Sequence, residues 1–287
     1  MTSLRQAVDR ATTDLARAGV DSPRSDAVTL AAFSLGVDRG EAQRLMALGV
    51  TEPEGYAHIV SERARRVPLQ HLTGSAGFRR LRLCVGPGVF VPRPETELTA
   101  GLVVEYLRGW SDPTGNDADP LVVDLGCGSG AIALAVKDEV ERARVVAVEL
   151  SPLALAWAER NVATLGLDVE LRQGDLRTAL TELDGTADVV VSNPPYIPPG
   201  AGPNQPEVRL HDPELALFGG GADGLALPAA VLAAAQRLLR PGGALVVEHA
   251  DSQGDTLTAM ARRGPWDEVA DRRDNLGRPR VLVARRR

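Results

Sequence analysis

The chain beyond Pro120 alternates short apolar runs with stretches of helical periodicity, and this alternation restricts the fold more than any other feature of the sequence. Residues 112–119, rich in Pro, Gly and Asp, are predicted to be the loop that leads into this region. Helices are predicted near residues 130–140, 152–165, 226–239 and 252–263. The apolar runs are typical of strands and lie near residues 121–125, 145–149, 168–171, 187–192, 243–248, 267–271 and 280–284. Strands that alternate with helices predict an α/β domain built on a parallel sheet.

Residues 1–75 show helical periodicity instead and are predicted to form a small separate helical domain. In the first helix apolar residues recur at helical spacing, at Leu4, Ala7, Val8, Ala11 and Leu15. A second helix is predicted to begin at Ser22 and Pro23, a serine cap followed by proline, with an apolar face of Ala27, Leu30, Ala31 and Phe33. A further helix is predicted to open at residues 51–54 and to end at Val67. Residues 1–67 contain nine arginines and nine acidic residues, a balance typical of a helical bundle with solvated charged faces and not of nucleic-acid binding.

Residues 76–97 are predicted to form a hairpin that connects the helical domain to a sheet domain at residues 98–287. Apolar and polar residues alternate from Phe78 to Val85, and the turn residues 86–88 lead into a second apolar run at 89–91. The stretch from Arg63 to Arg93 also contains seven arginines and no acidic residue. This run is either a solvated face or a docking surface for an acidic or phosphate-bearing partner.

Composition excludes several classes of protein. A net charge of −6 argues against nucleic-acid binding through a basic surface. Two cysteines and four histidines are too few for a disulfide framework or a zinc cluster, so no metal is expected. The N-terminal segment lacks the apolar core of a signal peptide, and no apolar run approaches the ~18 residues of a membrane span. The sequence therefore predicts a cytoplasmic protein that does not contact membranes.

A glycine-rich loop follows the first predicted strand of the sheet domain and is typical of a ligand-binding turn. Asp124 precedes Gly126, Gly128 and Gly130, and Ala131 opens the next helix. Gly126-x-Gly128-x-x-Ala131 satisfies a dinucleotide fingerprint, whereas Asp124-x-Gly-x-Gly-x-Gly is the pattern of class I methyltransferases. A carboxylate at this turn would repel a pyrophosphate but would hold the ammonium group of S-adenosylmethionine, which favours the second interpretation.

Two further carboxylates follow the next two strands. Glu149 ends the strand at 145–149, where it can accept hydrogen bonds from both hydroxyls of a ribose. Asp175 follows the strand at 168–171 and can accept one from an adenine amino group, although an acid after a strand is often only a cap or a turn residue. Because open α/β sheets bind ligands at the carboxyl ends of their strands, the three acids together predict one ligand site.

The strand at 187–192 ends in Asn193, Pro194, Pro195 and Tyr196, one of only three tyrosines. The prolines fix the backbone, so this loop is preorganised. The Asn193 side-chain oxygen and the Pro194 carbonyl can accept both N–H bonds of a planar NH2 group, and Tyr196 can pack against its plane. A proline turn with a buried asparagine is the structural alternative.

Asn-Pro-Pro-Tyr after the fourth strand resembles the signature of amino-methyltransferases that act on adenine N6, guanine N2 or a glutamine amide. Further stretches resemble the HemK/PrmC family: 68–74, 86–97, 207–217, 219–220, 223–225 and 274–280. The resemblance covers nearly the whole chain from residue 68, and the helical front end suits the family too. It departs mildly from the family pattern, with Glu149 where many members have Asp, Cys127 where many have Thr, and Leu176 where many have an aromatic residue.

This resemblance implies a class I methyltransferase (Rossmann-like) fold with a seven-stranded, mostly parallel sheet and helices on both faces. It implies methylation of the glutamine amide in the Gly-Gly-Gln motif of class 1 peptide chain release factors, with S-adenosylmethionine as donor and S-adenosylhomocysteine as product. The helical domain would then recognise the release factor, without direct contact to nucleic acid. Two rivals stay open, a nucleic-acid amino-methyltransferase and a non-catalytic S-adenosylmethionine-binding protein.

The resemblance also assigns site residues. Catalytic roles fall on Asn193, Pro194, Pro195 and Tyr196, and no histidine or cysteine base is expected. Substrate contacts are expected from these four residues together with Phe90, Arg93 and Glu95. The residues expected to bind the donor are Asp124, Gly126, Cys127, Gly128, Ser129, Gly130, Glu149, Leu150, Asp175, Leu176 and Asn193.

Overall fold

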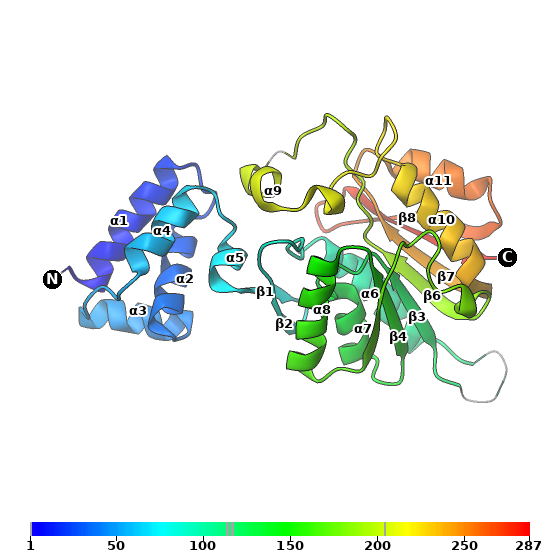
Figure 1. The fold of residues 1–287 in the computed structure, drawn as a ribbon, viewed down its shortest axis with the longest axis horizontal. Helices are drawn as coiled ribbons and strands as arrows, with labels where there is room; N and C mark the ends of the chain where they lie inside the picture. Colours follow the sequence, from blue (N-terminus) through cyan, green and yellow to red (C-terminus); the bar gives the residue numbers. More distant parts are fainter. Residues whose placement is uncertain (1, 113–114, 116–117, 204) are drawn as a thin grey trace. The chain divides into compact units, whose positions relative to one another are not determined.

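A computed structural model describes residues 2–112, 115, 118–203 and 205–287, which form two compact units (Figure 1). The first unit comprises the described residues up to Ser75 together with the segment 203–211. The second unit comprises residues 76–202 and 212–287. The sequence had placed segment 203–211 within the sheet domain, but its contacts assign it to the helical unit. The loop predicted at residues 112–119 lies partly outside the described residues.

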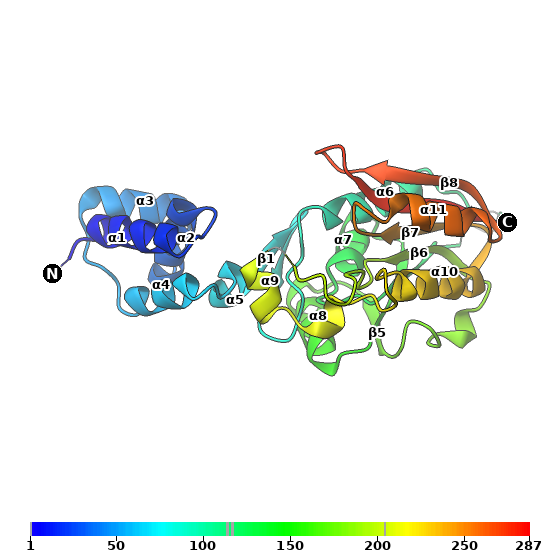
Figure 2. The ribbon, with the colours of Figure 1, turned by 90° about the horizontal axis from the view of Figure 1, so that it is seen from above.

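The first unit is helical, and α1, α2 and α3 pack side by side in both Figure 1 and Figure 2. The predicted face of α1 is buried, and Ser3 caps this helix in a reciprocal capping box with Gln6. The helices of the unit are α1 (Leu4–Arg17), α2 (Pro23–Leu35), α3 (Arg39–Leu48), α4 (Tyr56–Ala64), α5 (Leu69–Thr73) and α9 (Pro206–His211).

Three local predictions for this unit were wrong. Phe33 is 48% exposed, because six residues beyond Ala27 a helix has turned about 240° and points away from the buried face. The side chain of Ser22 makes no capping hydrogen bond, although α2 begins at Pro23 as expected. The helix predicted from residues 51–54 begins only at Tyr56. Thr51 instead forms an isolated antiparallel bridge with Ser3, and the Glu52 N–H donates to the Thr2 carbonyl, so this part of the chain is extended.

Buried ion pairs attach segment 203–211 to the helices of its unit. The Arg63 guanidinium lies 2.8 Å from both Asp26 and Glu207, and Arg66 lies 2.6 Å from Glu207. Because breaking a buried ion pair leaves an uncompensated charge, this network fixes α9 on the helical unit.

The second unit contains one seven-stranded sheet in the order β5-β4-β3-β6-β7-β9-β8. The pairs among β5, β4, β3, β6 and β7 are parallel, and β9 is antiparallel to both of its neighbours. The predicted seven-stranded, mostly parallel sheet is therefore confirmed. The strands are β3 (Leu121–Leu125), β4 (Arg144–Glu149), β5 (Val169–Gln173), β6 (Ala187–Ser192), β7 (Leu239–Glu248), β8 (Trp266–Arg273) and β9 (Pro279–Arg286).

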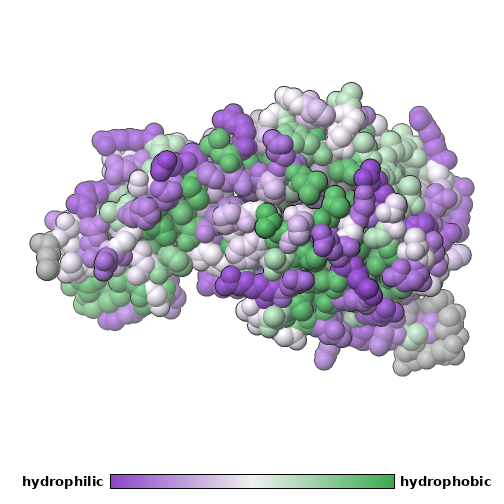
Figure 3. All heavy atoms as spheres, in the orientation of Figure 1, coloured by the Kyte–Doolittle hydropathy of each residue, from purple (hydrophilic) through white to green (hydrophobic). Residues whose placement is uncertain are grey.

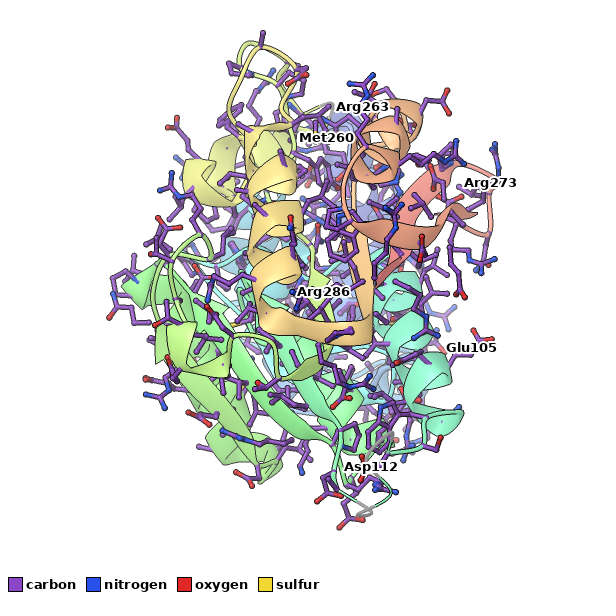
Figure 4. All side chains as sticks on the ribbon, turned by 90° about the vertical axis from the view of Figure 1, so that its right-hand side faces the viewer. Glu105, Asp112, Met260, Arg263, Arg273 and Arg286 are labelled. Atoms are coloured by element: carbon purple, nitrogen blue, oxygen red, sulfur yellow. The ribbon has the colours of Figure 1, made fainter. Side chains whose placement is uncertain are left out.

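Helices cover both faces of this sheet. Val122 of β3 belongs to the core beneath α6, α7 and α8, whereas its neighbour Val123 belongs to the core beneath α10 and α11. Met260 of α11, labelled in Figure 4, packs against this second core. The helices are α6 (Thr96–Arg108), α7 (Ala131–Glu139), α8 (Pro152–Leu165), α10 (Ala226–Leu238) and α11 (Gly254–Arg262).

The connecting hairpin exists, but its turn does not lie at the predicted residues 86–88. Its strands are β1 (Ser75–Phe78) and β2 (Leu81–Cys84), joined at Arg79 and Arg80. Arg79 has a positive φ of 50°, and its N–H donates to Glu97 Oε1, so a tertiary contact holds a turn that the residue type does not favour. The run at 89–91 is not a strand, and its residues Val89 and Val91 are buried in a small core that includes Ala154 of α8.

Ion pairs neutralise most of the arginine-rich run, so the sequence is a poor guide to its charge. In the second unit Arg79 pairs with Glu139, Arg80 with Asp138 and Arg93 with Asp212. In the first unit Arg63, Arg65 and Arg66 pair with acidic residues as well. Within the described ranges only Arg82 of the run has no ion-pair partner. The interpretation as a docking surface for an acidic partner therefore loses its basis.

None of the helices in the described residues is long and apolar enough to cross a membrane.

Candidate active site

The ends of β3 and β6 lie side by side where the strand order reverses, the point at which open α/β sheets bind ligands. From β3 the chain proceeds outward to β4 and β5, and β6 then returns to the other side of β3. The buried Ser192 hydroxyl donates to the Leu125 carbonyl at 2.6 Å. This bond joins the start of the glycine loop to the start of the Asn-Pro-Pro-Tyr loop.

The glycine loop folds back onto β4. The N–H groups of Gly126 and Cys127 donate to the Val148 carbonyl at 2.8 and 3.0 Å. The φ angles of Gly126 and Gly128 are +77° and +57°, a left-handed conformation that side chains with a Cβ rarely adopt. Burial raises the pKa of the Cys127 thiol, so the thiol stays protonated.

Asp124 is a buried carboxylate with one unpartnered oxygen. Its Oδ2 accepts a hydrogen bond from the Ala133 N–H at 3.2 Å, while Oδ1 has no partner among the described residues. Burial raises the pKa of Asp124 to about 7. Because buried polar atoms are normally satisfied, Oδ1 is a place for a cationic donor, and the ammonium group of S-adenosylmethionine fits it.

Glu149 stands at the end of β4 and holds the loop in shape. Its Oε2 accepts from the Gly128 N–H at 2.9 Å, and its Oε1 accepts from the Ser151 N–H at 2.8 Å. Each carboxylate oxygen can accept more than one hydrogen bond, so Glu149 keeps capacity for ribose hydroxyls.

The third predicted acid has a partner within the chain. Asp175 accepts hydrogen bonds from the Arg177 guanidinium, and this interaction lowers the pKa of Asp175. Leu176 is buried in the core beneath α10, and Leu150 is half-exposed beside Glu149. A contact between Asp175 and an adenine amino group stays a prediction, and it requires Asp175 to share its oxygens with Arg177.

The Asn-Pro-Pro-Tyr loop is held by a glycine-rich segment that follows α9. Ile197 and the Leu217–Gly219 segment exchange backbone hydrogen bonds of 2.8 and 3.0 Å. A Cβ on Gly219 would lie 2.0 Å from the Gly224 carbonyl oxygen and 2.7 Å from that of Pro195. Only glycine allows the two backbones to approach this closely. Gln253 adds a further support by donating to the Tyr196 carbonyl at 2.8 Å.

Asn193 is oriented by a buried threonine. Its Nδ2 donates to Thr96 Oγ1 at 3.1 Å, and Thr96 in turn donates to Glu248 Oε1 at 3.2 Å. The Asn193 Oδ1 and the Pro194 carbonyl accept no hydrogen bond from the described residues. Both hydrogen-bond acceptors that were predicted from the sequence are therefore available to a ligand NH2 group.

The remaining predicted substrate residues lie in the segment before α6. The Arg93 guanidinium stacks on Phe90, 4.9 Å from the ring centroid, and lies 2.7 Å from Asp212. Burial raises the pKa of Asp212 to about 6. Glu95 is partly exposed and directly precedes Thr96, which contacts Asn193. Burial also raises the pKa of Tyr196, so its hydroxyl stays protonated.

Comparison with known proteins assigns both parts of the chain. A family model described as the PrmC N-terminal domain matches residues 6–74, and one described as the methyltransferase small domain matches residues 81–202. The release factor glutamine methyltransferase of Streptomyces coelicolor is 50% identical to this chain, in an alignment that covers 100% of this chain and 99% of the relative. The chain belongs to the release factor glutamine methyltransferase family. Its relative of the same name in Mycolicibacterium smegmatis is 49% identical over 100% of this chain and 99% of its own.

The methyltransferase fold of this family member is also found in solved structures. The Thermus thermophilus 16S rRNA N2 G1207 methyltransferase, solved with AdoMet and guanosine, aligns with a TM-score of 0.50 at 23% identity. The alignment covers 74% of this chain and 50% of the other, and it shows the fold alone.

Sequence reasoning missed Asn161, a residue that supports the glycine loop. Asn161 of α8 is fully buried, and its Nδ2 donates to the carbonyls of Cys84 and Ser129, both at 3.0 Å. Its Oδ1 accepts from the Cys84 N–H at 2.6 Å. Asn161 thus joins the hairpin to the glycine loop, and its only signal in the sequence was a polar residue on the inner face of a predicted helix.

Proposed function

We propose that this protein transfers a methyl group from S-adenosylmethionine to the side-chain amide nitrogen of the glutamine in the Gly-Gly-Gln motif of class 1 release factors. The observation that carries this proposal is Asn193, which stands at the switch point of the sheet with its NH2 group engaged and its Oδ1 free. An acceptor pair of this kind selects a ligand that carries two N–H bonds in one plane. The names of the full-length relatives support a glutamine amide as that ligand.

The donor would be held by the residues at the ends of β3 and β4. Asp124 would accept from its ammonium group through the unpartnered Oδ1, and Glu149 would accept from its ribose hydroxyls. When bound, S-adenosylmethionine supplies an electrophilic methyl group on a sulfonium. Asp175 and Leu176 would lie at its adenine end.

The chain's own contribution to chemistry is to orient a weak nucleophile. The lone pair of an amide nitrogen is delocalised into the carbonyl, so the nitrogen reacts poorly in water. Asn193 and the Pro194 carbonyl hold both N–H bonds and thereby direct the nitrogen lone pair and favour its pyramidal form. Tyr196 packs against the amide plane. The cationic N-methylated amide is acidic enough to lose its proton to water, so no dedicated base is required.

A methyl-transfer assay tests this function directly. Purified protein is incubated with radiolabelled S-adenosylmethionine and a full-length release factor, and label is expected in the peptide that contains Gly-Gly-Gln. A release factor with alanine in place of that glutamine is the control and is expected to take up no label. Label in added RNA or DNA instead, falling steeply with salt, would identify a nucleic-acid amino-methyltransferase.

Donor affinity is expected to fall as the pH is lowered below about 7. Burial raises the pKa of Asp124 to about 7 in the free protein, and only the ionised carboxylate can pair with an ammonium group. Below that pH the affinity for S-adenosylhomocysteine should fall by up to about tenfold per pH unit. Calorimetric titrations between pH 5.5 and 8.5 measure it. Asp124→Asn is expected to bind weakly throughout without this slope, and a flat profile for the unmodified protein would contradict the assignment.

We also propose that the helical unit recognises the release factor, in the cytoplasm. Among the described residues of this unit, three large apolar side chains are exposed, Phe33, Leu48 and Leu210, and Figure 3 shows apolar surface over α3. Exposed apolar side chains of this kind are candidates for a protein contact.

Removing residues 1–67 is expected to abolish methylation of the full-length release factor at low micromolar concentration. A short Gly-Gly-Gln peptide, which needs only the sheet unit, is expected to be methylated at a similar, low rate with and without these residues. Because the deletion strips Glu207 of its partners Arg63 and Arg66, it is combined with Glu207→Gln. Glu207→Gln alone is the control, and full activity of the deletion variant on the release factor would refute the assignment.

A further inference from the structure

A buried carboxylate and two threonines stand behind Asn193, and the proposed reaction does not use them directly. Glu248 ends β7 and is 1% exposed. Its Oε1 accepts from Thr96 Oγ1 at 3.2 Å, and its Oε2 accepts from Thr99 Oγ1 at 2.9 Å. Both threonines lie in the first turns of α6, and only Thr96 also contacts Asn193.

The polarity of these hydrogen bonds follows from the charge of the carboxylate. Burial raises the pKa of Glu248 to about 7, and above that pH its ionised carboxylate only accepts, so Thr96 and Thr99 must both donate their single hydroxyl hydrogen to it. Thr96 Oγ1 is then left with lone pairs alone and can only accept from Asn193. The Asn193 amide must therefore turn its NH2 group to Thr96, which leaves Oδ1 for the ligand.

A flipped Asn193 would favour the wrong ligand. With Oδ1 toward Thr96 it would present an NH2 donor to the site, and a donor there repels the N–H bonds of glutamine. The same donor would attract a carboxylate such as that of glutamate. The orientation of one side chain thus decides between an amide and an acid of nearly the same shape.

We propose that Thr96 and Glu248 are positioning residues that fix the orientation of the Asn193 amide and thereby make the enzyme selective for glutamine over glutamate. This inference rests on the proposed function. The placement of Glu248 supports it, because a fully buried carboxylate held mainly by two hydroxyls is costly. No ion pair to Glu248 is found among the residues that the structure describes. An apolar side chain would serve packing alone at lower cost.

The test compares Thr96→Val, which keeps the shape of the side chain and removes its hydroxyl, with Thr96→Ser, which keeps the hydroxyl. Thr96→Val is expected to lower kcat on the release factor by roughly 10- to 100-fold while the Kd of S-adenosylhomocysteine stays within about twofold. Thr96→Ser should restore kcat to within about threefold of the unmodified enzyme. Binding of a release factor with glutamate in place of the target glutamine should tighten about tenfold in Thr96→Val relative to the unmodified enzyme, which a merely structural defect would not produce.

Thr99→Val is the matched control, since it removes a hydrogen bond to the same carboxylate without touching Asn193. It is expected to lower kcat no more than about threefold. Should Thr96→Val fail to fold by circular dichroism, Glu248→Gln provides the second variant: its amide can donate to Thr96 and so releases the constraint, with the same expected gain for the glutamate variant. Unchanged discrimination in the variant that folds, or equal losses in Thr96→Val and Thr99→Val, would overturn the inference. If the unmodified enzyme itself fails to methylate the release factor, the proposed function fails instead.

Discussion

Replacing Asn193 by alanine is expected to lower kcat by roughly 10²- to 10³-fold while donor affinity changes little. The substitution removes the free Oδ1 acceptor and leaves the Pro194 carbonyl as the single acceptor for the amide. One hydrogen bond cannot define the plane of an NH2 group, so the nitrogen lone pair would lose its direction toward the methyl group. The rate is measured by single-turnover methyl transfer to the release factor, and the donor affinity by calorimetric titration with S-adenosylhomocysteine.

The glycine loop should be unaffected by this substitution. Asp124 and Glu149 are held by backbone N–H groups of Ala133 and Gly128, not by Asn193. Asn275→Ala, at an exposed turn residue between β8 and β9, is the matched control and should behave as the unmodified enzyme. If the affinity for S-adenosylhomocysteine fell in parallel with kcat, Asn193 would be a residue that binds the methyl donor. Its role as the hydrogen-bond acceptor for the substrate amide would then have to be abandoned.

The sheet could be predicted from the sequence because its strands are buried on both faces. Runs such as residues 121–125 and 187–192 are almost wholly apolar and end in polar residues at one edge of a parallel sheet. Those ends carry Asp124, Glu149 and Asn193, so much of the site followed from the strand assignments alone.

Predictions from the sequence were wrong where tertiary contacts override the local backbone preference of a residue. Arg79 adopts a positive φ because Glu97 and Glu139 hold it, and this turn ended the hairpin earlier than the alternating pattern predicted. The helix α6 was not predicted, although Ala100, Val103 and Val104 recur at helical spacing and are buried.

The supports of the site could not be predicted because they join residues far apart in the chain. Thr96 contacts Asn193 and Glu248, which lie in different segments, and Asn161 reaches both Cys84 and Ser129. A single sequence contains no signal that pairs such residues. Their roles became visible only from the hydrogen bonds of the folded chain.

The second large effect is expected at Gly219, where two backbone segments approach closely behind the Asn-Pro-Pro-Tyr loop. Gly219→Ala is expected to lower kcat by roughly 10²-fold or more with donor affinity retained. The added Cβ would lie 2.0 Å from the Gly224 carbonyl oxygen and 2.7 Å from both the Pro195 carbonyl oxygen and Tyr196 Cα. All three are backbone atoms, which cannot move aside as a flexible side chain can, so the loop itself must shift.

Such a shift would displace Pro194 and Tyr196 from the amide while leaving the glycine loop at the end of β3 in place. Gly77→Ala is the matched control, since a Cβ there meets no atom within 4 Å and the φ angle is not positive. Single-turnover rates and the Kd of S-adenosylhomocysteine are measured for both variants, with melting temperatures to report the fold. An active Gly219→Ala enzyme would show that the loop tolerates displacement, and the preorganisation attributed to its prolines and glycines would then not be what sets the rate.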